Sequence, residues 1–214
     1  MVGQHENLEA LLRRAGVIPV LVIEDVAAAV PLARALVGGG LAVLEITLRT
    51  AAAADCIRAI IAEVEGITVG SGTVLDADQL ALSERLGCAF AVSPGSTPRL
   101  LAAAHDHAVP LLPGAATASE SMALLEEGYA VQKFFPAEQS GGVPYLGALV
   151  SPLPQVKFCP TGGINAANAA LYLKLANVVA VGGSWMMPKD RVAAGDWAEI
   201  EKMAASAAAF ALAR

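Results

Sequence analysis

Two apolar segments of the sequence carry charged residues that could do chemistry together. Lys133 lies in the middle of YAVQKFFPA (129–137), and Glu45 and Arg49 lie in LAVLEITLR (41–49). Burial and a nearby cation both favour the neutral form of an amine, which can attack a carbonyl carbon. Glu45 would then transfer protons, and Arg49 would bind a carboxylate through its planar guanidinium group. The alternative is a buried ion pair between Lys133 and Glu45 that has only a structural role.

A second set of candidate residues surrounds glycine pairs in the last third of the chain. The segment PTGGI contains Thr161, Gly162 and Gly163, and the segment VGGSW contains Ser184. Glycines let backbone N–H groups approach a phosphate closely, and a serine hydroxyl adds a further donor. The alternative is that the glycines only allow tight turns. Two such pairs, each at the end of an apolar segment, favour a phosphate site.

Regular elements must position these residues, and the sequence predicts them from its periodicity. Eight apolar segments rich in β-branched residues predict strands at 17–23, 41–49, 66–74, 88–95, 109–115, 129–137, 156–163 and 178–186. Helical patterns separate them at 25–39, 49–66, 76–87, 96–107, 119–128 and 165–176. Two further helices, at about 5–14 and 195–213, are expected to pack outside the strands.

The alternation of strands and helices predicts the fold class. Strands that are apolar on both faces belong to a parallel sheet covered by helices, so the chain is expected to be an α/β protein. Eight units fit a closed (β/α)8 TIM barrel, which would make residues 1–214 a single domain. An open, doubly wound sheet is the alternative, but no single phosphate fingerprint follows the first strand.

A barrel would bring the charged side chains together. Period-two alternation puts Glu45 and Arg49 on one face of the second strand, and Lys133 on the same face as Phe135 of the sixth strand. These two strands lie across an eight-stranded barrel from each other, so Glu45 and Lys133 would meet near its axis, with Arg49 nearer the mouth. Thr73 ends the third strand at the same carboxyl-terminal face, where the active sites of such barrels lie.

The composition excludes several classes of protein. The 214 residues are 56% hydrophobic and 16% charged, which excludes a disordered chain, and the net charge of -6 argues against a nucleic-acid partner. No apolar run is long enough to span a membrane, and the first residues lack the apolar core of a signal peptide. The three widely spaced cysteines favour a reducing cytoplasm, and neither they nor the three histidines have the spacing of metal ligands.

Seven motifs, in the order LEITLRT, VGSGTV, AVSPG, PLLPGA, KFFPAE, FCPTGGI and VGGSW, resemble those of one enzyme family. They are similar to the motifs of the 2-keto-3-deoxy-6-phosphogluconate (KDPG) aldolases, a family that also includes enzymes acting on 4-hydroxy-2-oxoglutarate. The resemblance runs through nearly the whole chain. It implies a (β/α)8 barrel, a homotrimer and a class I (Schiff-base) mechanism without a metal or an organic cofactor.

The resemblance also implies roles for individual residues. Lys133 of KFFPAE would be the Schiff-base lysine, and Glu45 of LEITLRT would be the general acid and base. The implied substrate-binding residues are Arg49 and Thr73 for the carboxylate, Phe135, Pro94 and Thr161 for the pocket wall, and Gly162, Gly163 and Ser184 for the phosphate.

The implied reaction cleaves KDPG to pyruvate and glyceraldehyde 3-phosphate, the aldol cleavage of the Entner–Doudoroff pathway. Cleavage of 4-hydroxy-2-oxoglutarate to pyruvate and glyoxylate is a further expectation for the same site, and an aldolase for the phosphogalactonate epimer of KDPG is an alternative. Two other classes stay open as alternatives. One is a phosphate-binding barrel that isomerises or epimerises a sugar phosphate, and the other is a non-catalytic barrel that senses one.

Overall fold

The computed structural model describes residues 2–212 and contains nine short strands, most of them followed by a helix. The strands are β1 (Val17–Leu21), β2 (Val43–Thr47), β3 (Thr68–Gly72), β4 (Phe90–Val92), β5 (Leu111–Leu112), β6 (Gly114–Ala115), β7 (Val131–Phe134), β8 (Lys157–Pro160) and β9 (Val181–Gly183). Each predicted strand is present but shorter than its apolar segment, and the predicted strand at 109–115 is divided into β5 and β6.

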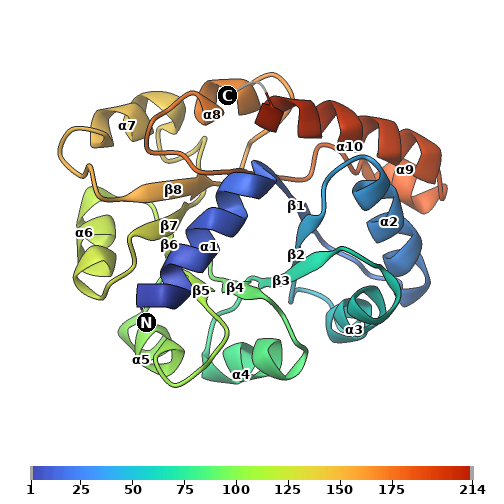
Figure 1. Cartoon of the computed structure of the whole chain (residues 1–214), viewed down its shortest axis with the longest axis horizontal. Helices are drawn as coiled ribbons and strands as arrows, with labels where there is room; N and C mark the ends of the chain where they lie inside the picture. Colours follow the sequence, from blue (N-terminus) through green and yellow to red (C-terminus); the bar gives the residue numbers. More distant parts are fainter. Residues whose placement is uncertain (1, 213–214) are drawn as a thin grey trace.

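Helices surround these strands (Figure 1). They are α1 (Val2–Ala15), α2 (Val26–Gly38), α3 (Ala53–Glu63), α4 (Ala77–Arg85), α5 (Pro98–Ala104), α6 (Ala118–Glu126), α7 (Gly142–Leu149), α8 (Ala169–Leu173), α9 (Lys189–Ala193) and α10 (Trp197–Leu212). The sequence did not predict α7 and α9. Residue 213, expected in the last helix, and residues 1 and 214 of the predicted domain lie outside the described residues.

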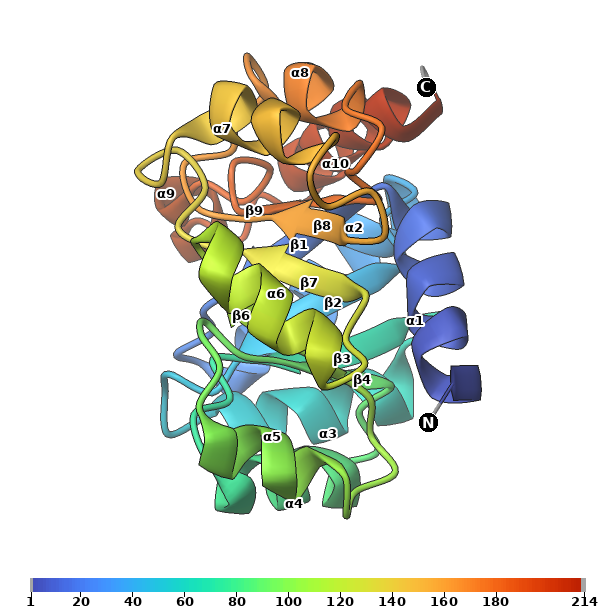
Figure 2. The ribbon, with the colours of Figure 1, turned by 90° about the vertical axis from the view of Figure 1, so that its left-hand side faces the viewer.

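The strands run parallel in two groups. Six form a sheet in the order β5-β4-β3-β2-β1-β9, and three form a sheet in the order β6-β7-β8. Pro113 separates β5 from β6 because a proline has no N–H for the strand ladder, although its carbonyl still accepts from the N–H of Lys133 at 2.8 Å. The α/β class and the parallel sheet predicted from the sequence are therefore confirmed, and the sheet is curled (Figure 2).

Apolar side chains pack on both faces of the curled sheet. The larger cluster lies between the strands and the surrounding helices, and includes Leu44, Ile46 and Phe158. A smaller cluster fills the inside of the curl, with members such as Val43, Phe90, Val92, Leu112, Val131 and Cys159.

Helix α1 closes one end of the inner cluster. Leu8 and Leu12 belong to that cluster together with Val43 and Val131, the first residues of β2 and β7. Figure 2 shows α1 standing beside the strands at this end, opposite the end toward which the strand arrows point. The carboxyl-terminal end of the curl is thus the end left for polar residues. No helix in the described part of the chain has both the length and the apolar character that crossing a membrane requires.

Candidate active site

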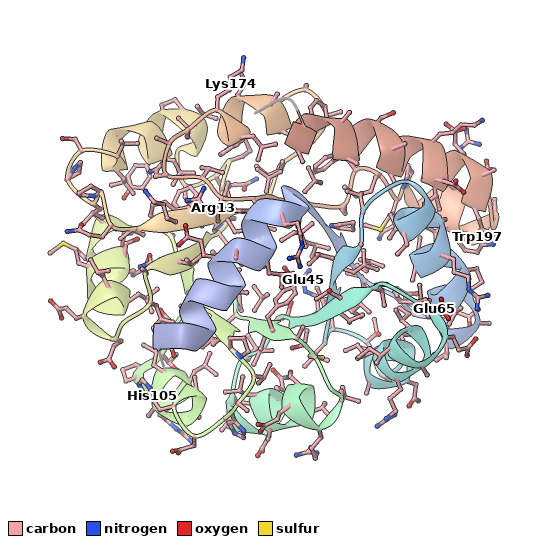
Figure 3. The ribbon with its side chains drawn as sticks, in the orientation of Figure 1. Arg13, Glu45, Glu65, His105, Lys174 and Trp197 are labelled. Atoms are coloured by element: carbon pink, nitrogen blue, oxygen red, sulfur yellow. The ribbon has the colours of Figure 1, made fainter. Side chains whose placement is uncertain are left out.

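Lys133 and Glu45 meet inside the curled sheet. Lys133 Nζ lies 3.2 Å from Oε1 of Glu45, and the two side chains are only 4% and 5% exposed. Figure 3 places Glu45 near the centre of the molecule among the strands, whereas Glu65 and Lys174 lie at its periphery. A buried ammonium or carboxylate is stabilised by such a partner, and the same contact permits proton transfer between the two groups.

Glu45 and Lys133 each follow, by two residues, a valine whose side chain packs inside the curl. Val43 precedes Glu45 on β2, and Val131 precedes Lys133 on β7, so the period of two turns all four side chains inward. The register of the sheet then fixes the position of Lys133 along the strands, because Lys133 pairs with Gly114 on β6 and with Cys159 on β8.

Arg49 and Thr73 form a second contact at the carboxyl-terminal ends of β2 and β3. Nε of Arg49 donates to Oγ1 of Thr73 at 2.8 Å, and the arginine remains exposed. Thr73 has a φ of 58°, a left-handed conformation that is strained for a threonine and that aims its hydroxyl at the guanidinium group. A guanidinium held in this way keeps its terminal nitrogens available for a carboxylate.

Phe135 lies close to the lysine, and Pro94 lies against the strand that pairs with the lysine strand. Lys133 Nζ lies 5.3 Å from the centre of the Phe135 ring, within the range of a cation–π contact. Pro94 approaches the strand that pairs with Lys133 only because Gly114 has no side chain, since a Cβ atom there would lie 2.3 Å from the Pro94 carbonyl carbon. The Phe135 ring thus gives the lysine an apolar neighbour.

The glycine pairs lie together on the neighbouring strand ends. Thr161 forms an isolated parallel bridge with Gly182, and a Cβ atom at Gly182 would lie 2.4 Å from Oγ1 of Thr161. Gly162 and Gly163 have φ values of 100° and 79°, which a glycine adopts readily. Ser184 is exposed just beyond β9, and no hydrogen bond joins it to Thr161 within the described residues.

Three charged or polar contacts thus lie at one end of the strands: the amine–carboxylate pair, the guanidinium–hydroxyl pair and the glycine loops. An amine in contact with a carboxylate can form and hydrolyse an imine, and a guanidinium at the same end of the strands can bind the carboxylate of a keto acid. No three His, Cys, Asp or Glu side chains gather as potential metal ligands within residues 2–212.

The sequence model of the KDPG and KHG aldolases matches residues 8–203 of the chain. The chain belongs to this family. The "KHG/KDPG aldolase" of Escherichia coli (strain K12) is 50% identical over 207 residues, which cover 97% of both chains.

Two solved structures of family members are similar throughout. The KDPG aldolase of Zymomonas mobilis ZM4, solved with 3-phosphoglycerate, has a TM-score of 0.91 at 47% identity and covers 96% of this chain and 97% of its own. The KDPG aldolase of Legionella pneumophila has a TM-score of 0.89 at 44% identity, covering 92% and 96%. That enzyme was captured with pyruvate as a covalent carbinolamine intermediate.

Several residues that shape the candidate site of this chain were not singled out from the sequence. Gly72 and Gly114 make room for Glu45 and Pro94, and Glu138 contacts the glycine loop after β8. The sequence offered one signal for Glu138, its place in the KFFPAE motif directly after the lysine strand. The two glycines had the same kind of signal, their places in VGSGTV and PLLPGA, but the side chains that they face depend on the register of the sheet.

Proposed function

We propose that the chain is a class I aldolase that cleaves KDPG to pyruvate and glyceraldehyde 3-phosphate. The single observation that carries the proposal is the buried pair of Lys133 Nζ and Glu45 Oε1, 3.2 Å apart. The carbinolamine in the Legionella pneumophila relative supports it, because a carbinolamine is the adduct of an amine with a ketone.

The reaction begins with a covalent bond between enzyme and substrate. The neutral amine of Lys133 attacks the C2 ketone of KDPG to give a carbinolamine, which loses water to form a protonated imine. Glu45 supplies the proton that the leaving water needs and takes back the proton that the amine loses. The cationic imine then withdraws electrons from the neighbouring carbon–carbon bond.

The second stage breaks that bond. Glu45 removes the proton of the C4 hydroxyl, directly or through one water, and the C3–C4 electron pair moves into the imine to form an enamine. Glyceraldehyde 3-phosphate leaves with C4 as its aldehyde carbon. The enamine takes a proton at C3, and water then hydrolyses the resulting imine to release pyruvate and the free Lys133 amine.

The remaining residues hold the substrate in place. Arg49 and Thr73 bind the carboxylate next to the ketone, an assignment supported by their 2.8 Å contact at the ends of β2 and β3. The proposed pocket wall and phosphate contacts are Phe135, Pro94, Thr161, Gly162, Gly163 and Ser184. The name of the Escherichia coli relative supports cleavage of 4-hydroxy-2-oxoglutarate as a second activity of the same residues.

The architecture that we propose around the site is a closed (β/α)8 barrel that forms a single domain and assembles as a homotrimer. Closure is supported by two isolated bridges, Phe158–Val178 and Thr161–Gly182, which link β8 to the segment of β9. A cytoplasmic location is supported by the three cysteines, all in the described part of the chain, which are buried and form no disulfide.

Trapping the imine tests the proposed function. The protein is incubated with pyruvate and then with borohydride, and the labelled peptide is identified by mass spectrometry. We expect one reduced pyruvyl group on Lys133 and none on Lys157, which begins the neighbouring strand β8 and donates to the carbonyl of Pro154. A label on another lysine, or no label, would contradict the mechanism. Kinetics on KDPG, its galactonate epimer and 4-hydroxy-2-oxoglutarate then rank the substrates.

A further inference from the structure

The loop after β8 has its carbonyl groups held by the protein, one after another. The carbonyl of Thr161 accepts from the N–H of Ala137 at 2.8 Å, and that of Gly162 accepts from the N–H of Glu138 at 3.1 Å. Both donors lie on the turn that follows the lysine strand β7. The strand that carries Lys133 and the glycine loop are therefore joined by the backbone.

The carbonyl of Gly163 is held by two side-chain amides. Nδ2 of Asn165 and Nδ2 of Asn168 donate to it at 3.2 and 3.1 Å. The orientation of both amides is fixed by their oxygens, because Asn168 Oδ1 accepts from the N–H of Asn165 and Asn165 Oδ1 accepts from the N–H of Ala167. The amides thus prevent the Gly163 carbonyl from turning toward the mouth.

The N–H groups that follow are unengaged. Across residues 2–212, no acceptor receives a hydrogen bond from the N–H of Gly163 or Ile164. Consecutive backbone N–H groups without protein partners form a concave donor set that suits an anion, and they are effective only if the loop is held in this shape.

The side chain of Glu138 presses against this loop. A Cβ atom at Gly163 would lie 2.5 Å from Cγ of Glu138 and 2.7 Å from its Cβ, so the loop and the glutamate are in direct contact. The hydroxyl of Tyr172, which is fully buried on α8, donates to Oε1 of Glu138. Burial and this bond raise the pKa of Tyr172 above its usual value, so the hydroxyl stays protonated and keeps donating.

From these contacts we infer that Glu138, held by Tyr172, is a positioning residue that shapes the Gly162–Gly163 loop for the phosphate of the substrate. The inference rests on the proposed function and extends it. It assigns the preference for phosphorylated over unphosphorylated substrates to a side chain that does not touch the substrate. The backbone bonds from Ala137 and Glu138 set the height of the loop relative to Lys133, and the Glu138–Tyr172 pair sets its conformation.

Steady-state kinetics on KDPG and on 4-hydroxy-2-oxoglutarate test this inference. We expect Glu138→Ala to raise KM for KDPG about tenfold or more, since the loop loses its side-chain support. The fold loss of kcat/KM on KDPG should be at least about ten times the fold loss of kcat/KM on the unphosphorylated substrate. Glu138→Gln should remain close to the parent protein, because the amide oxygen can still accept from Tyr172. The matched control is Glu126→Ala, which removes an exposed glutamate of α6.

Two further measurements keep the test decisive. Tyr172→Phe removes only the hydroxyl and should shift the substrate preference in the same direction, which covers the case in which Glu138→Ala fails to fold. Borohydride trapping of pyruvate on Lys133 is carried out on every variant. Absence of the label from the parent protein would contradict the proposed function itself. Normal labelling with equal losses on both substrates, or with no loss on either, would overturn only the positioning role of Glu138.

Discussion

Gly72 on β3 leaves the space that the carboxylate of Glu45 on β2 occupies. A Cβ atom at Gly72 would lie 2.2 Å from Oε1 of Glu45 and 2.7 Å from its Cγ, both far inside van der Waals contact. The two strands are locked in register here, since Glu45 pairs with Gly70 and Thr47 pairs with Gly72. A glycine at position 72 therefore determines where the carboxylate lies relative to Lys133.

Replacing Gly72 by Ala should displace the Glu45 carboxylate and lower kcat by at least about tenfold. Proton transfer by a positioned acid or base contributes about 10²–10⁴-fold, and part of this is lost when the group moves away. Overpacking should also reduce the free energy of unfolding by about 1–3 kcal/mol. Steady-state kinetics and urea titration measure the two effects. Gly147→Ala is the control, because a Cβ atom there meets only Leu175 at an ordinary 3.7 Å. A Gly72→Ala protein with unchanged kcat would show that the position of Glu45 is not critical.

Ser184 gives a prediction about the phosphate. Ser184→Ala should raise KM for KDPG more than KM for 4-hydroxy-2-oxoglutarate, because the hydroxyl is proposed to contact only the phosphate. A hydrogen bond to a charged group is worth about 1.5–3 kcal/mol, so an effect of about tenfold or more is expected. Ser206→Ala is the control, since its hydroxyl bonds only the carbonyl of Lys202 on α10. Equal changes for both substrates would remove Ser184 from the phosphate site.

Periodicity and the expected barrel together predicted where the central pair would lie. Alternation along β2 and β7 put Glu45 and Lys133 on inward faces, and the structure places their side chains 3.2 Å apart although 88 residues separate them. Apolar strands fix the direction of every second side chain, so a charged residue in such a strand can be placed before the fold is known.

Features that depend on packing between distant segments could not be predicted in this way. The bond from Tyr172 to Glu138 joins α8 to the turn after β7, and no sequence period connects them. Helix α7 was missed because its sequence, GVPYLGAL, contains two glycines and a proline, which are signals for a loop. The division of the strand at 109–115 follows from Pro113, whose effect on the ladder depends on the register of its neighbours.

A contact away from the site predicts a pH dependence of stability. The hydrogen bond from His107 Nδ1 to Glu84 Oε2 at 2.6 Å, helped by the N–H of Ala108, lowers the pKa of Glu84 below its ordinary value of 4.5. Ionised Glu84 is thus favoured in the folded state. Its contribution to stability is present above the ordinary pKa and is lost as the pH falls through the lowered value.

Glu84→Gln should therefore flatten the acid side of the curve of unfolding free energy against pH, measured by urea titration between about pH 3 and pH 6. Glu126→Gln removes an exposed carboxylate of α6 and serves as the control. Parallel curves for the parent protein and Glu84→Gln would show that the contact with His107 contributes nothing to folding.

The proposed homotrimer predicts the mass of the particle in solution. Val22 and Leu75, both close after strand ends, are 51% and 56% exposed, and their burial in a subunit interface would remove this apolar surface from water. Light scattering at micromolar concentration should give a mass of three chains of 21.7 kDa. A monomer mass would contradict the trimer and leave the chemistry of the site untouched.

Glu45→Gln separates the catalytic role of the central pair from a structural one. Glutamine keeps the size and hydrogen-bonding shape of the side chain but cannot transfer a proton, so kcat should fall by about 10²–10⁴-fold. Exchange of the pyruvate methyl protons with deuterated water, followed by NMR, should fall with it. Glu65→Gln, at the exposed periphery, should change neither.

The imine should still form in Glu45→Gln because the Lys133 amine is intact. It should form more slowly because glutamine cannot transfer the protons. Borohydride trapping should therefore still label Lys133 with pyruvate while proton exchange is nearly abolished. This combination is expected only if Glu45 moves protons to and from the substrate carbon after the covalent bond has formed. If exchange continued at the parent rate, Glu45 would be only the counter-ion of a buried ammonium group, and a different base would have to act on the enamine.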